Sequence, residues 1–182
     1  MIDPLMITEI RPVLRHPNCR VVLVCGPPGA GKSTYVAAHA DDGDPVIDLD
    51  NIAKEYGLGR DRPRDRLGFL LKERNKRLDA LAELEPHKTA WVILSAPSSR
   101  LRAWWCDSLG VKPDDLIVLA PAVPELKRRI LADPDRRYVV AEHFAVVKRW
   151  FELERANDPG TIGSGCDESG MPADPLHPWN AR

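Results

Sequence analysis

The sequence predicts an α/β protein, a three-layer fold in which a mostly parallel sheet of four to five strands has helices on both faces. Two observations lead to this prediction. Helical patterns alternate with strands, and β-α-β alternation implies parallel strands covered on both sides. Short apolar runs of strand length supply the strands, at Val21–Cys25, Val46–Leu49, Ala90–Ser95 and Leu116–Ala120.

Length and composition indicate one globular domain. The 182 residues are 43% hydrophobic and 29% charged, which is ordinary for a chain that buries its own core. A net charge of −1 gives no overall attraction to nucleic acid or membrane, so such a preference has to come from a local patch. No C-x-x-C pair is present, and we expect a reduced, cytoplasmic protein without a leader peptide or membrane span.

The first predicted strand leads into a complete G-x-x-x-x-G-K-S motif at residues 26–33. Its glycines allow the backbone to turn tightly and approach a ligand closely. The loop amides and the positive end of the following helix, predicted over 33–40, can then hold phosphate groups. In this motif Lys32 reaches the β- and γ-phosphates, and the Ser33 hydroxyl ligates Mg²⁺.

The strand–loop–helix context predicts that ATP, or another nucleoside triphosphate, binds here with Mg²⁺. The alternative is a chance match in a glycine- and proline-rich turn. The predicted nucleotide-binding residues are Gly26, Pro27, Pro28, Gly29, Ala30, Gly31, Lys32, Ser33 and Thr34.

The second predicted strand ends in two carboxylates, Asp48 and Asp50. Ligands of parallel sheets bind at the carboxyl ends of the strands, where the glycine-rich loop also opens. Period-2 alternation would place both side chains on one side. Either could accept the proton of an attacking hydroxyl, and Asp50 could hold Mg²⁺ together with Ser33. The alternative for Asp50 is that it only caps a short helix over 51–56.

The connection to the third strand is basic. Residues 54–77 contain nine cations and four acids, and a helix with a leucine stripe is predicted over 65–84. Such a surface favours a phosphate-bearing acceptor, a nucleotide or a nucleic-acid end. We interpret the segment as one of charge alone, without a base-stacking platform. Arg74 either meets an acceptor phosphate or lays its stem along the leucine stripe.

Further arginines follow the fourth strand. A helix beginning at Pro124 ends in an Asp-Pro-Asp loop at residues 133–135, and the flanking arginines are Arg128, Arg129, Arg136 and Arg137. Phosphoryl transfer requires positive charge on the moving group, and we predict that Arg129 and Arg136 supply it. The alternative is a solvated basic face. His143, in the last helix predicted over 139–155, is interpreted as a structural residue.

Together these features resemble the small P-loop kinases, especially the group that contains polynucleotide 5′-kinases and zeta-toxin-like kinases. The resemblance rests on Gly26–Ser33, on the Asp48/Asp50 strand end and on the Arg128–Arg137 lid, and it spans residues 20–155. An AAA-type ATP-binding classification also fits. The composition changes at Asp158, which predicts a P-loop kinase-like domain over residues 1–157 and an irregular Gly- and Pro-rich tail over 158–182. The tail either docks, for example with a protein partner, or is a mobile terminus.

Two departures from that group concern the acceptor and the metal. Its Asp-x-apolar-Arg element combines a general base with an acceptor-binding Arg. Here the element reads Asp50-Asn51-Ile52-Ala53, so the Asp carries over and the Arg does not, although Lys54 is adjacent. The third strand ends in Ser95 instead of the acid that many P-loop proteins use to support Mg²⁺. Ser95 either bonds a Mg²⁺ water or the γ-phosphate, or is a plain strand-end serine.

The leading hypothesis is an ATP- and Mg²⁺-dependent kinase that acts on a nucleotide, a nucleoside or a nucleic-acid 5′ end. The alternative is an ATPase that drives or regulates a nucleic-acid-associated partner. A nucleotide-binding protein without catalysis is a third interpretation. The predicted catalytic residues are Lys32, Asp48, Asp50, Arg129 and Arg136.

Overall fold

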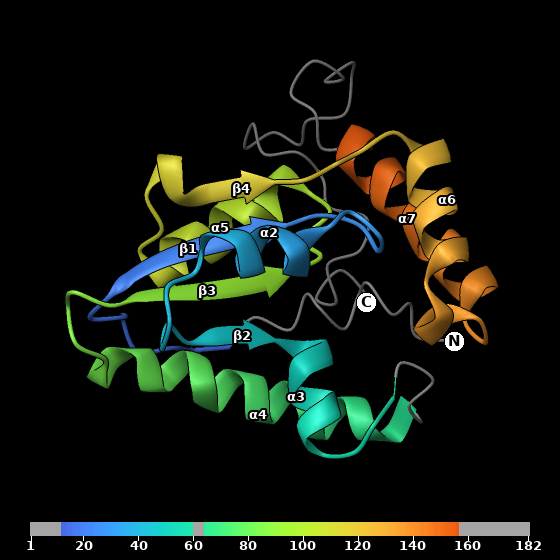
Figure 1. The fold of residues 1–182 in the computed structure, drawn as a ribbon. Helices are drawn as coiled ribbons and strands as arrows, with labels where there is room; N and C mark the ends of the chain where they lie inside the picture. Colours follow the sequence, from blue (N-terminus) through green and yellow to red (C-terminus); the bar gives the residue numbers. More distant parts are fainter. Residues whose placement is uncertain (1–11, 60–63, 157–182) are drawn as a thin grey trace, which may run out of the picture.

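A computed structural model describes residues 12–59 and 64–156. Within these residues four parallel strands form one sheet in the order β2-β3-β1-β4 (Figure 1). The prediction of an α/β fold with a parallel sheet is confirmed. The strands are β1 (Arg20–Cys25), β2 (Val46–Asp48), β3 (Thr89–Leu94) and β4 (Leu116–Val118).

Six α-helices belong to the described part of the chain. The helix predicted over 65–84 is a shorter α-helix with 3₁₀ turns at both ends, η1 (Arg64–Arg66) and η2 (Leu81–Glu83). Further 3₁₀ turns are η3 (Pro113–Asp115) and η4 (Pro134–Arg136). The α-helices are α2 (Lys32–His39), α3 (Leu49–Glu55), α4 (Leu67–Ala80), α5 (Ser99–Leu109), α6 (Val123–Ala132) and α7 (Val140–Ala156).

Alternating side chains of the strands build a core on each face of the sheet, as a strand's period of two requires. On one face Leu23 of β1 packs in a cluster with residues of α3, α4 and α5, including the nearly inaccessible Trp105. On the other face Val24 packs with Val36 of α2. Figure 1 shows α2 in front of the sheet and α5 behind it, so helices cover both faces, as predicted.

Helices α6 and α7 form a third cluster beyond the carboxyl edge of the sheet (Figure 1). Leu126 and Ile130 of α6 and Val147 of α7 are at most 1% exposed and pack against Ala30 of the glycine-rich loop. Burial of each such side chain contributes about 1.5–3 kcal/mol. This packing places two helices directly beside the predicted nucleotide site.

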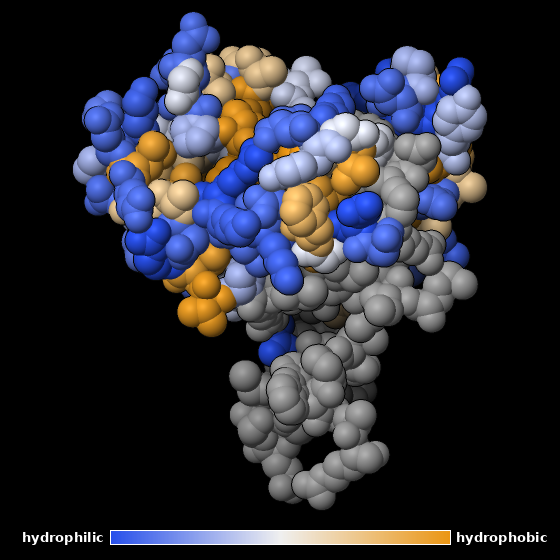
Figure 2. All heavy atoms as spheres, turned by 90° about the horizontal axis from the view of Figure 1, so that it is seen from below, coloured by the Kyte–Doolittle hydropathy of each residue, from blue (hydrophilic) through white to orange (hydrophobic). Residues whose placement is uncertain are grey.

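The face that carries α3 and α4 is largely hydrophilic, with small apolar patches (Figure 2). None of the helices in the described ranges is long and apolar enough to cross a membrane. The tail over 158–182 lies outside the described residues, as do Arg60, Arg62 and Cys166.

Candidate active site

The glycine-rich loop joins β1 to α2 and is pressed against its neighbours. Gly26 has φ of 151°, and a Cβ there would lie 2.2 Å from the carbonyl oxygen of Leu119. Gly29 has φ of 78°, and a Cβ there would lie 3.1 Å from Cγ1 of Ile130. Both positions therefore need glycine. Helix α2 begins without a side-chain cap, which leaves its first amides directed at the loop's cradle.

Lys32 is hydrogen-bonded to the backbone of the glycine-rich loop. Its Nζ donates to the carbonyl oxygens of Gly26 at 2.7 Å and Pro27 at 2.9 Å. Burial lowers the pKa of this ammonium group to about 8, although the charges of Asp48 and Asp50 act in the opposite direction. Among the residues that the structure describes, no carboxylate is bonded to this cation, which lies at the glycine-rich loop.

The end of β2 differs from the prediction in one respect. The strand ends at Asp48 and α3 begins at Leu49, so Asp50 lies in a helical first turn and period-2 alternation does not apply to it. The prediction that both carboxylates share one strand side was wrong. The helix cap is Asp48 and not Asp50, because Oδ1 of Asp48 accepts from the Asp50 amide at 3.1 Å.

Asp48 also reaches the glycine-rich loop. Its Oδ2 accepts a hydrogen bond from Ser33 Oγ at 3.4 Å, and only 7% of the residue is exposed. Burial and the charge of Asp50 raise the pKa of Asp48, while the Asp50 amide lowers it. The predicted proximity of Ser33 and the β2 carboxylates is therefore realised through Asp48, with Asp50 on the same cavity wall.

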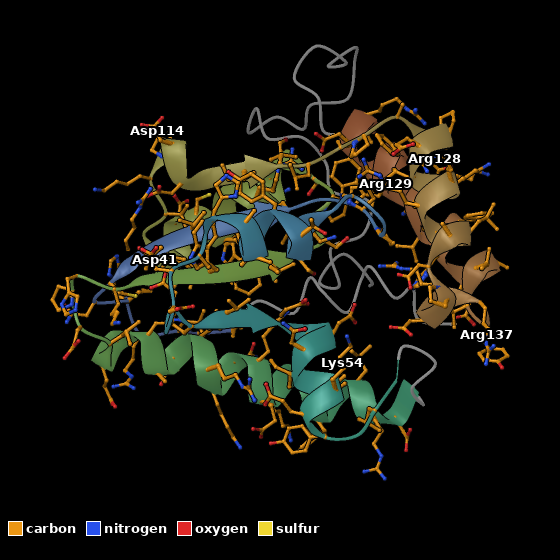
Figure 3. All side chains as sticks on the ribbon, viewed as in Figure 1. Asp41, Lys54, Asp114, Arg128, Arg129 and Arg137 are labelled. Carbon is orange, nitrogen blue, oxygen red and sulfur yellow. The ribbon has the colours of Figure 1, made fainter. Side chains whose placement is uncertain are left out.

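Two of the predicted lid arginines face the site. Arg129 Nη1 donates to the Ala30 carbonyl at 3.3 Å, and its Nε donates to Glu125 at 2.7 Å. Arg136 Nε donates to Asp133 at 2.6 Å. Figure 3 shows Arg129 directed toward the loop, whereas Arg137 points away from the molecule, where its guanidinium lies over Tyr138.

One cavity of about 1280 Å³ joins these groups. Its walls come from the glycine-rich loop, α2, the end of β2, the first turns of α4 and the α6–α7 pair. Leu67 and Leu71 of α4 contribute apolar side chains to its lining. Asp48, Asp50, Arg129 and Arg136 all line it. The structure thus brings the predicted catalytic residues around one hollow.

Arg74 does not line this cavity. It is 1% exposed, and its guanidinium donates to Asn75 Oδ1 and lies 5.2 Å from the centre of the Trp105 ring. Burial lowers its pKa to about 10. Of the two interpretations of Arg74, the structure favours burial along the leucine stripe.

Several cavity residues escaped the sequence analysis. On α2, Tyr35 and His39 stack with ring centres 4.1 Å apart, and their i,i+4 spacing behind the loop was a signal that could have revealed them. On α7, Glu142, His143 and Arg149 also line the cavity. His143 Nδ1 lies 3.4 Å from Arg136 Nη1, so it belongs to the cavity wall and not only to the helix core.

Ser95 stands where many P-loop proteins carry an acid. Its carbonyl accepts from the Gly26 amide at 3.3 Å and from Trp150 Nε1 at 2.8 Å. Its Oγ is buried and makes no hydrogen bond within the described structure, although the residue lines the cavity. A buried hydroxyl without a hydrogen-bond partner lowers the stability of the fold unless a bound ligand forms a hydrogen bond with it.

The oxygen atoms that could ligate a metal at this site suit Mg²⁺ bound together with a nucleotide better than a free metal ion. Residues 12–59 and 64–156 contain no cluster of three or more His, Cys, Asp or Glu that could hold a metal. Mg²⁺ normally keeps several waters and binds through one or two protein oxygens plus substrate phosphates. The Ser33 hydroxyl and the adjacent Asp48 carboxylate provide that number of oxygens beside the phosphate loop.

Fold and site together define a P-loop NTPase of the kinase-like class. The chain belongs to the AAA domain family, whose pattern matches residues 21–153, from β1 into α7. Among solved structures, a chain of "Structure of the Pnkp1/Rnl/Hen1 RNA repair complex" matches with a TM-score of 0.54 and 15% identity. The match covers 85% of this chain and 54% of that one, so this chain spans about half of its length. A search of curated proteins gave no match.

Proposed function

We propose that this protein is an ATP- and Mg²⁺-dependent kinase that phosphorylates a hydroxyl group of a nucleotide, a nucleoside or a nucleic-acid 5′ end. The proposal depends on one observation. The cavity that contains the glycine-rich loop is also lined by Asp50, Leu67 and Leu71. Ligand pockets usually measure about 300–1000 Å³, so this one has room for an acceptor beside a nucleotide.

Each group of residues around the cavity has its own role in the proposed reaction. The loop amides and Lys32 bind the triphosphate. Mg²⁺ would be held by Ser33, with Asp48 bonding its water shell, and it would neutralise phosphate oxygens. Arg129 and Arg136 add positive charge around the γ-phosphoryl group while it is transferred. A carboxylate within reach of the acceptor hydroxyl serves as general base, and we assign this role to Asp50.

In the transfer step the acceptor oxygen forms a bond to the γ-phosphorus. The bond from that phosphorus to the β,γ-bridging oxygen breaks, and ADP leaves. The hydroxyl proton passes to Asp50. Both carboxylates line the cavity, and we assign Asp48, which contacts Ser33, to the magnesium side and Asp50 to the acceptor side.

ATP hydrolysis for the benefit of a partner is the second candidate. The kinases that the sequence resembles carry an acceptor-binding Arg at one position of the helix that corresponds to α3. The residue found there in this chain favours the second candidate. Here that position is Ala53, which is 0% exposed in the core. No side chain at this point of α3 can reach an acceptor without disrupting the core, so an acceptor needs other contacts, of which the adjacent Lys54 is one.

An Asp50→Asn variant separates the candidates. We expect phosphate transfer from γ-labelled ATP to a panel of hydroxyl acceptors, followed on thin-layer plates. General-base catalysis contributes about 10²–10⁴-fold, so the variant should lose that factor in rate while its affinity for ATP stays unchanged. Asp41→Asn, on the exposed turn after α2, is the matched control and should behave as wild type.

Two results would redirect the assignment. ATP hydrolysis that no acceptor stimulates and that Asp50→Asn leaves unchanged would favour the ATPase. Tight ATP binding without turnover in either protein would favour a nucleotide-binding protein that lacks catalysis.

A further inference from the structure

Two aromatic rings lie exposed within the basic segment. Tyr56, just after α3, is 48% exposed, and Phe69, in the first turn of α4, is 40% exposed. The rings meet edge to face, with centres 4.9 Å apart at 84°. Together with Leu58 and Arg66 they line a hollow of about 270 Å³. The interpretation of residues 54–77 as charge alone was therefore incomplete, because rings do stand among the cations.

The charge around this hollow suits a polyanion. Glu73 accepts from Tyr56 Oη at 3.3 Å and is bonded to Lys76 at 2.6 Å. Glu55 is likewise bonded to Arg77. Two of the segment's four acids, Glu55 and Glu73, are thus bonded to its cations. Its remaining exposed cations include Lys54, Arg66 and Lys72.

The hollow lies close to the proposed acceptor site. Tyr56 follows Asp50 by six residues, which is about 9 Å along a helix. Helix α4 separates the two hollows at its start: Leu67 and Leu71 line the large cavity, and Phe69 lines the small one. A nucleic-acid strand rises about 3.4 Å or more per nucleotide, so a strand that starts at Asp50 needs at least about three nucleotides to reach the rings.

We propose that Tyr56 and Phe69 form a base-stacking platform for a single-stranded nucleic acid whose 5′ end enters the cavity. The inference rests on the proposed kinase function and narrows its acceptor to a strand instead of a free nucleoside. Exposed aromatic rings bind single strands because each unpaired base offers a π-face, and cations beside them follow the phosphate backbone. Bases in a duplex are already stacked and paired, so a duplex cannot use such a platform.

Binding of 5′-hydroxyl oligonucleotides of one, two, four and eight nucleotides to the full chain tests this directly. Fluorescence anisotropy, read with a non-hydrolysable ATP analogue present, should show affinity rising between two and four nucleotides. Stacking of a base on one ring is worth about fivefold or more in affinity. Phe69→Ala and Tyr56→Ala should each weaken binding of the longer strands by that factor and leave the mononucleotide unaffected.

Ring-preserving variants make the test specific. Phe69→Tyr and Tyr56→Phe should bind as wild type, whereas Phe69→Leu, which retains apolar volume without a ring, should bind as Phe69→Ala. Leu131→Ala removes an apolar side chain that is 65% exposed on α6 and should change nothing. Unchanged affinity for the ATP analogue in each variant shows that the fold is intact.

The experiments distinguish failure of the base-stacking platform from failure of the kinase assignment. Equal affinity for all strand lengths, or full affinity in Phe69→Leu, overturns the platform even if small acceptors are phosphorylated; a hollow used by a protein partner would give this result. Length-dependent binding that is lost in Phe69→Leu supports the platform even if no acceptor is phosphorylated, in which case the kinase assignment fails alone.

Discussion

At the scale of single residues, Lys32 makes nucleotide binding sensitive to pH. Its pKa is lowered to about 8 by burial, so the ammonium is charged at pH 7 and largely neutral at pH 9. A bound polyphosphate restores the charge, because a nearby anion favours the protonated form. We predict that affinity for Mg·ADP falls up to about tenfold between pH 7 and pH 9, since one pKa unit corresponds to a factor of ten.

Isothermal titration calorimetry at pH 8.5 in two buffers of different ionisation enthalpy measures the linked protons. Wild type should take up protons on binding. Lys32→Arg keeps its charge throughout this range, so its affinity should be nearly independent of pH even if it is weaker. Absence of proton uptake in wild type would contradict the lowered pKa.

At the scale of elements, α7 is fastened to the segment that follows β3. Arg102 of α5, 7% exposed, donates to the carbonyls of Ala96 and Pro97 and makes two bonds of 2.8 and 2.9 Å with Glu154 of α7. Trp150 of α7 is fully buried and donates to Ser95. These contacts hold a cavity-lining helix against the strand end that supports the glycine-rich loop.

Glu154→Ala should therefore lower the free energy of unfolding by about 1–3 kcal/mol, because it leaves a buried guanidinium without its anionic partner. Chemical denaturation monitored by tryptophan fluorescence measures this loss. Glu152→Ala is the control on the same helix: its ion pairs, at 3.9 and 3.6 Å, are looser and more exposed, so the change should stay within about 0.5 kcal/mol. Equal effects of the two variants would contradict the fastening role of Glu154.

The β1–loop–α2 unit was predictable because its chemistry is local: glycines, a lysine and a serine at fixed spacing. The end of β2 was misjudged by about one residue, since the side chain of Asp48 could either continue the strand pattern or cap a helix, and the cap prevailed. His143 reaches the cavity through the long-range packing of α7, which no local pattern encodes, whereas Ser95 follows the predicted third strand and was recognisable from it.

At the scale of the whole molecule, the cavity joins units that are far apart in the sequence. The glycine-rich loop forms its floor, β2, α3 and α4 form one wall, and α6 and α7 form the other. The loop contacts the α6 wall directly, because Ile130 lies against Gly29 and Arg129 bonds the Ala30 carbonyl. A nucleotide bound in the loop is therefore placed where it can connect all three.

This arrangement predicts that nucleotide binding stabilises the entire chain. A ligand that binds only the folded state at 100 times its Kd adds about 2.7 kcal/mol to the free energy of unfolding. For a domain of this size that raises Tm by about 5–10 °C. Differential scanning calorimetry with Mg²⁺ and a non-hydrolysable ATP analogue should show the whole unfolding transition moving to higher temperature.

Lys32→Ala should lose most of the shift, whereas Glu154→Ala should start from a lower Tm and shift by the same amount. A shift that persists in Lys32→Ala at the same analogue concentration would place the nucleotide outside the glycine-rich loop.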